Sequence, residues 1–335
     1  MISELTLQLI QAWLQGAPLP HLTSDVIKLM TLHQLGGLLS HIAPPMSASD
    51  AEICAQAWQK NALLHLKRLR ILQKVWPNQA PEPMIFKGAD YCEQLYRDPG
   101  IRACCDLDFL VPGDFDALAR HLEKFATEIR QPQQMRFPGA PFDSLGFVID
   151  GCLLELHRQI VPLPPHALRA EELWSRSQKH RVFEELCVRC PTPHDRLAIW
   201  LAHAAKDAFD LQLMKYIDFI TILKQQTDDF TPMLERTHLS APYLLALKRL
   251  QMLNLSSSSY PTPKRSVREQ LQVQLAQKLL PQPWDSLQMQ PTGIKRDFIK
   301  ALLWHPKDFL PKAAAALWHR CVPNPRSTAK TPAQK

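Results

Sequence analysis

Two carboxylates in the apolar run at residues 105–111 constrain this chain more than any other feature. Asp106 and Asp108 are one residue apart, so in a β-strand their side chains project from the same face. Two like charges that close together are costly to bury unless a positive group neutralises them. A divalent metal ion is the usual solution. The alternative is a solvent-exposed strand face, but the apolar residues at both ends of the run favour a buried strand.

The segments around this run indicate a small mixed sheet. Short apolar runs at residues 84–86, 103–111, 144–149 and 152–159 predict strands. Between the last two lies Asp150-Gly151, a common two-residue hairpin turn. Residues 89–96 and 114–125, the second capped by Asp114, predict helices. This order is typical of an α+β fold with a small sheet covered by helices on one face.

Helical periodicity dominates on both sides of this core. Residues 1–76 predict helices, the longest over residues 50–75 with Ser47 or Ser49 as its cap, and residues 197–209, 211–224, 242–252 and 267–280 predict further ones. We therefore expect five regions. They are an N-terminal helical region (1–79), an α+β core (80–165), a helical region packing on the core (166–255), a basic helical extension (256–321) and a disordered tail (322–335).

The composition indicates a cytoplasmic protein with reduced cysteines. No run approaches the roughly 18 apolar residues that a membrane span needs, and the N-terminus lacks the pattern of a secretory signal. The 8 cysteines lie mostly in apolar surroundings, which favours small buried side chains over disulfides. Cys187 and Cys190 form a lone CxxC without a second pair at zinc-ligand spacing, so a metal or redox site there is not favoured.

Positive charge is concentrated at the C-terminus. Residues 264–335 contain 13 Lys/Arg and 4 Asp/Glu, a balance of +9, which leaves −2 for the rest of a chain whose net charge is +7. Such a segment suits phosphate-rich partners or acidic lipid headgroups. A solvated helical surface with a basic tail is the favoured alternative, since no nucleic-acid-binding motif accompanies the charge.

A third carboxylate lies in the second strand of the predicted hairpin. Glu155 and His157 share one face of that strand, opposite two leucines. Three carboxylates on adjacent strands of one sheet are therefore expected to converge. Hard oxygen ligands of this kind favour Mg²⁺ or Mn²⁺ over zinc.

These motifs, in this order, resemble a known family. The sequence is similar to an uncharacterised bacterial nucleotidyltransferase family of the DNA polymerase β-like superfamily, over roughly residues 80–225. The resemblance rests on motifs that follow one another along the chain. They are Lys87-Gly88-Ala89, Leu95-Tyr96-Arg97-Asp98-Pro99, Arg102, Asp106 to Val111, Leu154 to Arg158, Glu172-Leu173-Trp174, His203 to Lys206 and Lys215 to Asp218.

The resemblance implies a fold and a site. It implies a small mixed-sheet nucleotidyltransferase core of the polymerase β type, in which Asp106, Asp108 and Glu155 are the catalytic and metal-binding carboxylates. Gly88 and Ala89 match the place where the superfamily approaches the nucleotide phosphates, at a helix start that suits an anion. The superfamily more often has serine where this chain has Ala89, and aspartate where it has Glu155.

Further polar residues are candidates for contacts with the nucleotide, each with a structural alternative. Lys87 is either a phosphate contact or a solvated turn residue. His157 is either a phosphate contact or a polar neighbour of Glu155. Arg102 is either a phosphate contact or a structural partner of Asp106. His203 and Lys206 lie near one helical face. They either close over the nucleotide or form a polar pair in helix packing, and the second reading is slightly favoured.

The function that the resemblance implies is metal-dependent nucleotidyl transfer. A nucleoside monophosphate passes from an NTP, such as ATP, to a hydroxyl of a small molecule, sugar or protein, with Mg²⁺ or Mn²⁺ as cofactor and pyrophosphate released. The alternatives are an inactive descendant that binds a nucleotide or a partner protein, and a nucleic-acid-binding protein using the basic segment. Nucleic acid is possible as a partner but not favoured. The sequence selects neither the acceptor nor the base.

Overall fold

A computed structural model of the chain gives a mixed α+β fold built around one seven-stranded sheet. It describes residues 4–77, 80–130, 144–160, 168–183, 186–207, 209, 211–255, 260–261, 270 and 273–277. The predicted helix at residues 267–280 lies largely outside these residues, as does the predicted extension at 256–321. The predicted tail at 322–335 lies wholly outside them.

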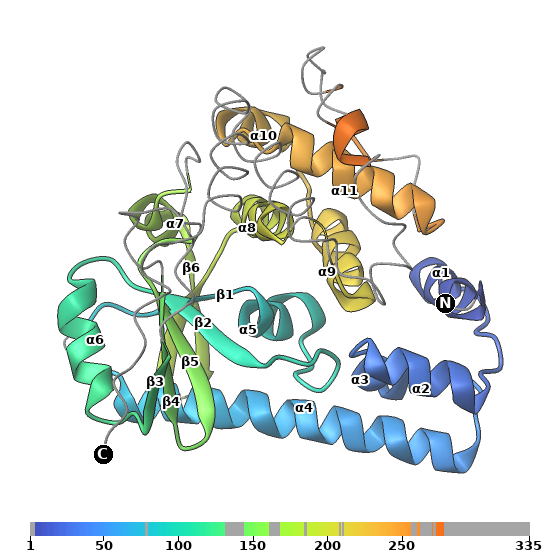
Figure 1. Ribbon diagram of the computed structural model, residues 1–335, viewed down its shortest axis with the longest axis horizontal. Helices are drawn as coiled ribbons and strands as arrows, with labels where there is room; N and C mark the ends of the chain where they lie inside the picture. Colours follow the sequence, from blue (N-terminus) through green and yellow to red (C-terminus); the bar gives the residue numbers. More distant parts are fainter. Residues whose placement is uncertain are drawn as a thin grey trace, which may run out of the picture.

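Four helices form the N-terminal part of the chain, as the periodicity predicts. They are α1 (Glu4–Gln15), α2 (Ser24–Leu32), α3 (Gly36–Ile42) and α4 (Ala48–Val75). The α4 helix begins at the predicted cap, where the Ser47 hydroxyl accepts a hydrogen bond from the Asp50 amide at 3.2 Å. It runs beneath α2 and α3 at one end and beneath the sheet at the other (Figure 1).

The sheet has the strand order β3-β4-β5-β2-β1-β7-β6. β2 is parallel to β5 and β1 is parallel to β7, whereas the other neighbours are antiparallel. The sheet is therefore mixed, as expected. The strands are β1 (Met84–Phe86), β2 (Asp106–Leu110), β3 (Glu128–Arg130), β4 (Ser144–Ile149), β5 (Cys152–His157), β6 (Gln178–Phe183) and β7 (Leu186–Cys190).

Local turn and cap chemistry fixes several connections. Asp150 and Gly151 both have positive φ, 49° and 74°, which is the backbone of a tight hairpin turn and joins β4 to β5. Helix α6 (Phe115–Glu123) starts at Asp114, whose side chain accepts from the Ala117 amide at 2.9 Å. The predicted helix after β1 consists of α5 (Gly88–Tyr91) continued by a short π-helix, η1 (Cys92–Tyr96).

Helices lie on both faces of the sheet, not on one as the sequence indicated. One face packs on the second half of α4 and on α6 through Leu72, Leu107, Leu118 and Leu154, all in one buried cluster. On the other face, Phe86 of β1 belongs to a second cluster together with helices further along the chain. The physical reason is the alternation of β1, whose three residues are all buried and point to both sides.

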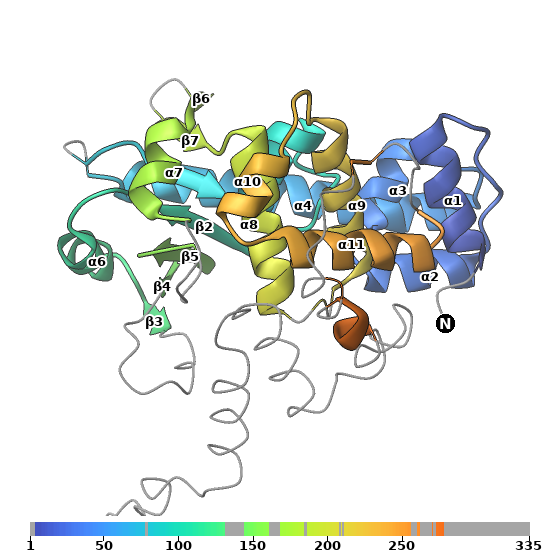
Figure 2. The same ribbon diagram turned by 90° about the horizontal axis from the view of Figure 1, so that it is seen from above.

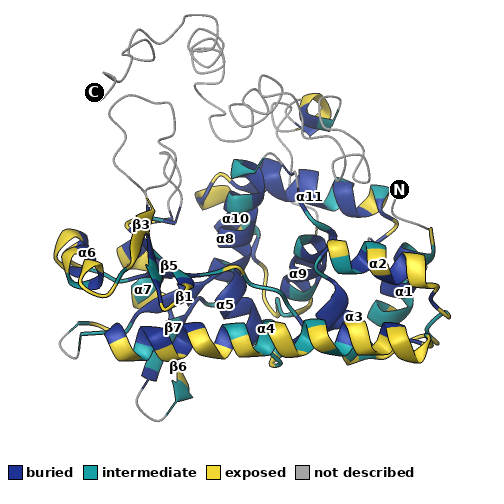
Figure 3. Cartoon of the chain, turned by 60° about the horizontal axis from the view of Figure 1, so that its bottom comes forward, coloured by how far each residue is buried: buried dark blue, intermediate teal, exposed yellow. Residues whose placement is uncertain are grey.

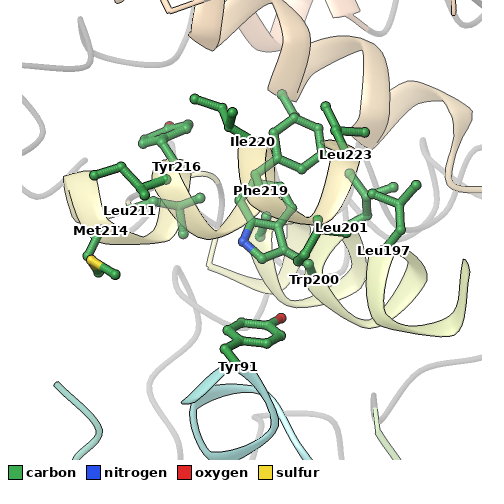
Figure 4. Packing of buried hydrophobic residues seen from close by; sticks show 14 of the residues in the cluster. Tyr91, Leu197, Trp200, Leu201, Leu211, Met214, Tyr216, Phe219, Ile220 and Leu223 are labelled. Atoms are coloured by element: carbon green, nitrogen blue, oxygen red, sulfur yellow. The ribbon is translucent and has the colours of Figure 1, made fainter. Parts of the chain in front are cut away.

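The second cluster is made mainly by the C-terminal helices. They are α7 (Ala170–Arg176), α8 (Pro193–Lys206), α9 (Leu213–Lys224), α10 (Thr231–Arg236) and α11 (Ser240–Met252). At its centre Trp200 of α8 stacks on Phe219 of α9 with ring centroids 4.3 Å apart, and Tyr91 of α5 reaches toward them from below (Figure 4). Helices α8 and α9 lie above α5 (Figure 1), and the view from above shows α8, α9, α10 and α11 gathered on this side of the molecule (Figure 2).

The hairpin β6–β7 is an element that the sequence did not indicate. Residues 178–190 lie within the region 166–255 that was expected to be helical, but they form two strands. β6 lies at the sheet edge and has no buried residue, so its sequence lacks the alternation that marks a strand. Cys187 and Cys190 lie three positions apart on β7 and so project from opposite faces, which excludes a shared metal ion at this CxxC.

Among the described residues, no helix combines the length and the apolar character needed to cross a membrane.

Candidate active site

Two adjacent parallel strands bring the predicted carboxylates together. In the register of β2 and β5, Asp108 lies opposite Glu155 and Leu110 lies opposite His157. Because side chains alternate along a strand, Asp106, Asp108, Glu155 and His157 all project from one face. The other face of both strands carries the leucines and Phe109 that pack on α4 and α6. The sequence thus predicted the correct faces, and the sheet order supplies the convergence.

Asp108 is the centre of the site. Its Oδ1 atom accepts hydrogen bonds from Lys87 Nζ and from His157 Nε2, each at 2.7 Å. His157 Nε2 lies 3.3 Å from an oxygen of Glu155, which joins the second strand to the cluster. The side chains of Asp108 and His157 are only 4% and 5% exposed, whereas that of Glu155 is 29% exposed. The open side of the cluster is therefore at Glu155.

Three of these side chains are arranged to hold a metal ion. Ligand atoms of Asp108, Glu155 and His157 all lie within 4.8 Å of one another. Two carboxylates and an imidazole are a donor set that fits a divalent cation: the carboxylate oxygens suit Mg²⁺ or Mn²⁺, and the imidazole suits a transition-metal ion. Asp106 does not belong to this group of three. His157, expected to be a phosphate contact or a polar neighbour of Glu155, does belong to it.

Asp106 and Asp108 have opposite electrostatic environments. The negative charge of Asp108, together with burial, raises the pKa of Asp106 to about 6. Burial also acts to raise the pKa of Asp108, but the Lys87 ammonium and the His157 hydrogen bond outweigh it and hold that pKa below its ordinary value. Asp108 is thus firmly ionised, and Asp106 is the carboxyl of this pair that takes up a proton near pH 6.

Lys87 reaches Asp108 from an unusual backbone conformation. It has φ 55° and ψ −128°, a region that glycine adopts readily and other residues rarely do. The next residue, Gly88, has no room for a side chain, since a Cβ there would lie 2.6 Å from Cys104 Sγ and 2.8 Å from Arg102 Nη1. The turn between β1 and α5 therefore lies directly against the loop that precedes β2.

Ala89 faces the core and not the site. Its side chain is 2% exposed and packs in the cluster that contains Leu107 and the α4 leucines. A serine hydroxyl in this orientation would enter an apolar environment. The departure from the superfamily pattern at this position is thus explained by packing.

Arg102 is held by Asp218 of α9 and not by Asp106. Its Nε donates to both Asp218 oxygens at 3.0 Å, and its Nη1 donates to the Ala103 carbonyl at 3.1 Å. The Tyr96 hydroxyl donates to Asp218 at 2.8 Å. Arg102 and Asp218 are 12% and 0% exposed, so this is a buried ion pair between the loop before β2 and the helical layer.

His203 is in the last turn of α8. It interacts electrostatically with Lys87, Lys206, Asp108 and His157, so it lies within the electrostatic range of the Asp108 cluster. Burial, reinforced by Lys87 and Lys206, lowers the pKa of His203 well below its ordinary value, so the ring is neutral. Its Nε2 atom is inaccessible to solvent and has no hydrogen-bond partner among the described residues. Lys206, also in this turn, lies near His203.

A buried ion pair that sequence reasoning missed fixes α8 in this position. Arg196 of α8 donates from Nε and Nη2 to the two oxygens of Asp90 in α5, at 2.6 and 2.9 Å. Asp90 is 0% exposed and Arg196 is 5% exposed. The only signal in the sequence was the presence of charged residues within apolar helices. Asp90 and Arg196 are 106 positions apart, so no periodic pattern in the sequence indicates that they pair.

The chain matches a known protein family. A family described as "Uncharacterised nucleotidyltransferase" matches residues 25–253, more than half of the chain. The matched range starts in α2 and ends directly after α11, so it includes the whole sheet and every candidate site residue. No curated protein matches the chain.

Proposed function

Because this chain belongs to the uncharacterised nucleotidyltransferase family, we propose that it transfers a nucleoside monophosphate from an NTP to an acceptor hydroxyl and releases pyrophosphate. The observation that carries this proposal is the convergence of Asp108, Glu155 and His157 within 4.8 Å on two parallel strands, with Asp106 beside them. Such a cluster suits a divalent cation, and a cation held there would neutralise the negative charge of a bound triphosphate.

The carboxylates would hold the cofactor, Mg²⁺ or Mn²⁺. A divalent cation bound by Asp108, Glu155 and His157, with Asp106 nearby, would neutralise the triphosphate and stabilise the charge that develops on the phosphoryl oxygens. Lys87 and His203 would lie against the phosphates, Gly88 would allow their close approach, and Lys206 would add charge from α8. Arg102, held by Asp218, would position this loop and reach the phosphates only through its remaining donors.

The chemical step is an in-line displacement at the α-phosphorus. The acceptor oxygen forms a bond to this phosphorus, the bond to the bridging oxygen breaks, and pyrophosphate leaves with the electron pair. We assign the acceptor's proton to Glu155, because it is the most exposed carboxylate of the metal-holding group and so the most accessible to an incoming hydroxyl.

Transfer of label from α-labelled nucleotides tests this proposal. The protein is incubated with each α-labelled NTP, Mg²⁺ or Mn²⁺, and a cell extract that supplies acceptors. We expect label to move to an acceptor in the wild type and to fall by at least about 100-fold in Asp108→Asn and Glu155→Gln, since each removes a charge that holds the cation. Asp25→Asn, at a 96% exposed position on α2, is the matched control and should keep full transfer.

A nucleotide-binding protein without transferase activity is the second candidate. Its support is the ion pair between Lys87 and Asp108, which neutralises the central carboxylate with a protein group. In that case, the wild type would bind an NTP with a divalent ion but transfer no label to any acceptor. If it showed neither transfer nor metal-dependent NTP binding, both candidates would be wrong.

A further inference from the structure

Lys87 places a positive charge among the atoms that would hold a divalent ion. Its Nζ atom is 2.7 Å from Asp108 Oδ1, the same oxygen that bonds to His157 Nε2. Asp108 and His157 both belong to the group of three metal-holding residues. An ammonium at this distance from Asp108 and a divalent ion on the same carboxylate would repel each other strongly in this largely buried setting.

We propose that Lys87 is a tethered cation that competes with the divalent ion for Asp108, so that the site binds the ion weakly alone and more tightly together with a nucleotide. This inference rests on the proposed function. A triphosphate offers the Lys87 ammonium a new anionic partner, whereas a free ion offers none. Nucleotide binding therefore releases Asp108 to the metal, and the two ligands favour each other's binding.

The backbone at Lys87 supports a specific role for its side chain. A non-glycine residue at φ 55° and ψ −128° is strained, and glycine would relieve that strain. The chain nevertheless has a lysine here, and its side chain aims at Asp108. The ammonium also lies 5.2 Å from the centre of the Phe86 ring, a second contact that favours a cation at this place.

The lysine is also free to change partners. Its side chain is 24% exposed, compared with 4% for Asp108, so one side of it borders the solvent from which a nucleotide would enter. Lysine carries a compact charge on a flexible stem and turns between acceptors more easily than the planar arginine fork does. The surrounding carboxylates, Asp106 and Glu155, keep the ammonium at the site when no other cation is present.

Mn²⁺ binding to Lys87 variants tests this inference without reference to turnover. Mn²⁺ affinity is measured by electron paramagnetic resonance, with and without a non-hydrolysable NTP analogue, for the wild type, Lys87→Met and Lys87→Gly. Both variants should bind Mn²⁺ alone about tenfold more tightly than the wild type and should gain less from the analogue. Lys87→Gly also relieves the strained backbone, so at least one cation-free variant is expected to fold.

Two controls isolate the competing charge. Lys87→Arg keeps a cation at the site and should keep weak binding of Mn²⁺ alone. Lys74→Met, at a 66% exposed lysine on α4, should match the wild type. Unchanged or weaker Mn²⁺ affinity in both Lys87→Met and Lys87→Gly overturns the inference, even where the wild type transfers label. Absence of Mn²⁺ binding in every form overturns it as well, and the label-transfer assay then shows whether the proposed function fails with it.

Discussion

Asp106 and Asp108 are two positions apart on one strand, yet their surroundings move their pKa values in opposite directions. Lys87 and His157 both contact Asp108, and the resulting fixed negative charge is what raises the pKa of the neighbouring Asp106 to about 6. Lys87, in the turn after β1, and His157, on β5, thus keep Asp108 ionised beside a carboxyl whose pKa is raised. The strained Lys87 and the crowded Gly88 are adjacent in that turn, where backbone strain often marks a functional site.

The raised pKa of Asp106 predicts a pH dependence of metal binding. Below about pH 6 Asp106 takes up a proton, the site loses one negative charge, and Mn²⁺ affinity should fall by up to about tenfold per pH unit. Above that pH, affinity should be nearly constant. Titration calorimetry between pH 5 and 8 measures this, and Asp106→Asn should remove the change near pH 6. A break that persists at the same pH in Asp106→Asn would assign the proton to another group.

Buried polar pairs fix the elements around the site. Arg196–Asp90 ties α8 to α5, and Arg102–Asp218 ties α9 to the loop before β2. A third network places Glu93 of the π-helix between His65 of α4 and His180 of β6, at 2.6 and 2.9 Å. Each pair joins a helix to a segment next to the site, so these contacts position α8, which carries His203, and the segments around the turn after β1.

Breaking the Arg196–Asp90 pair should be strongly destabilising. Asp90→Asn leaves the Arg196 guanidinium buried without a counter-charge, which typically costs about 3–5 kcal/mol of unfolding free energy. Urea denaturation measures the change, and nucleotide affinity should fall with it because α8 carries His203. The exposed Asp25→Asn should change stability by less than about 0.5 kcal/mol. The double variant Asp90→Leu/Arg196→Met should recover most of the loss; a loss equal to that of Asp90→Asn would contradict this account.

One buried cluster joins the two ends of the described chain. Leu9 of α1, Ile27 of α2 and Leu38 of α3 belong to the same cluster as Trp200 and Phe219. The long α4 contributes Cys54 to this cluster and Leu72 to the cluster on the other face of the sheet. Its outward side is exposed along much of its length (Figure 3). The N-terminal helices therefore complete the core that supports α8 and α9.

This shared core predicts cooperative unfolding. Leu9→Ala, at a 0% exposed position in α1, should lower the free energy of unfolding of the whole protein by about 2–5 kcal/mol. The urea midpoint should fall accordingly, without a separate early transition. Tryptophan fluorescence and far-UV circular dichroism should give coincident curves. Leu63→Ala, at a 68% exposed position on α4, serves as the control and should have little effect. An early fluorescence change confined to Leu9→Ala would show that the N-terminal helices unfold by themselves.

Local signals determined much of this protein from its sequence. Period-two alternation placed Asp106 and Asp108 on one face of a strand and Glu155 and His157 on one face of another, and Asp150-Gly151 and Ser47 marked a turn and a helix start. These features depend on residues within a few positions of one another, so a single sequence reveals them.

Only the tertiary structure decided which of these faces meet. The parallel pairing of β2 with β5 opposes Asp108 to Glu155 and brings in His157, and the turn after β1 delivers Lys87 to the same oxygen. The Arg196–Asp90 pair and the polar edge strand β6 were not predicted. Contacts between residues about a hundred positions apart leave no periodic pattern, and an edge strand without buried residues leaves no alternation, because both arise from burial that exists only once the chain has folded.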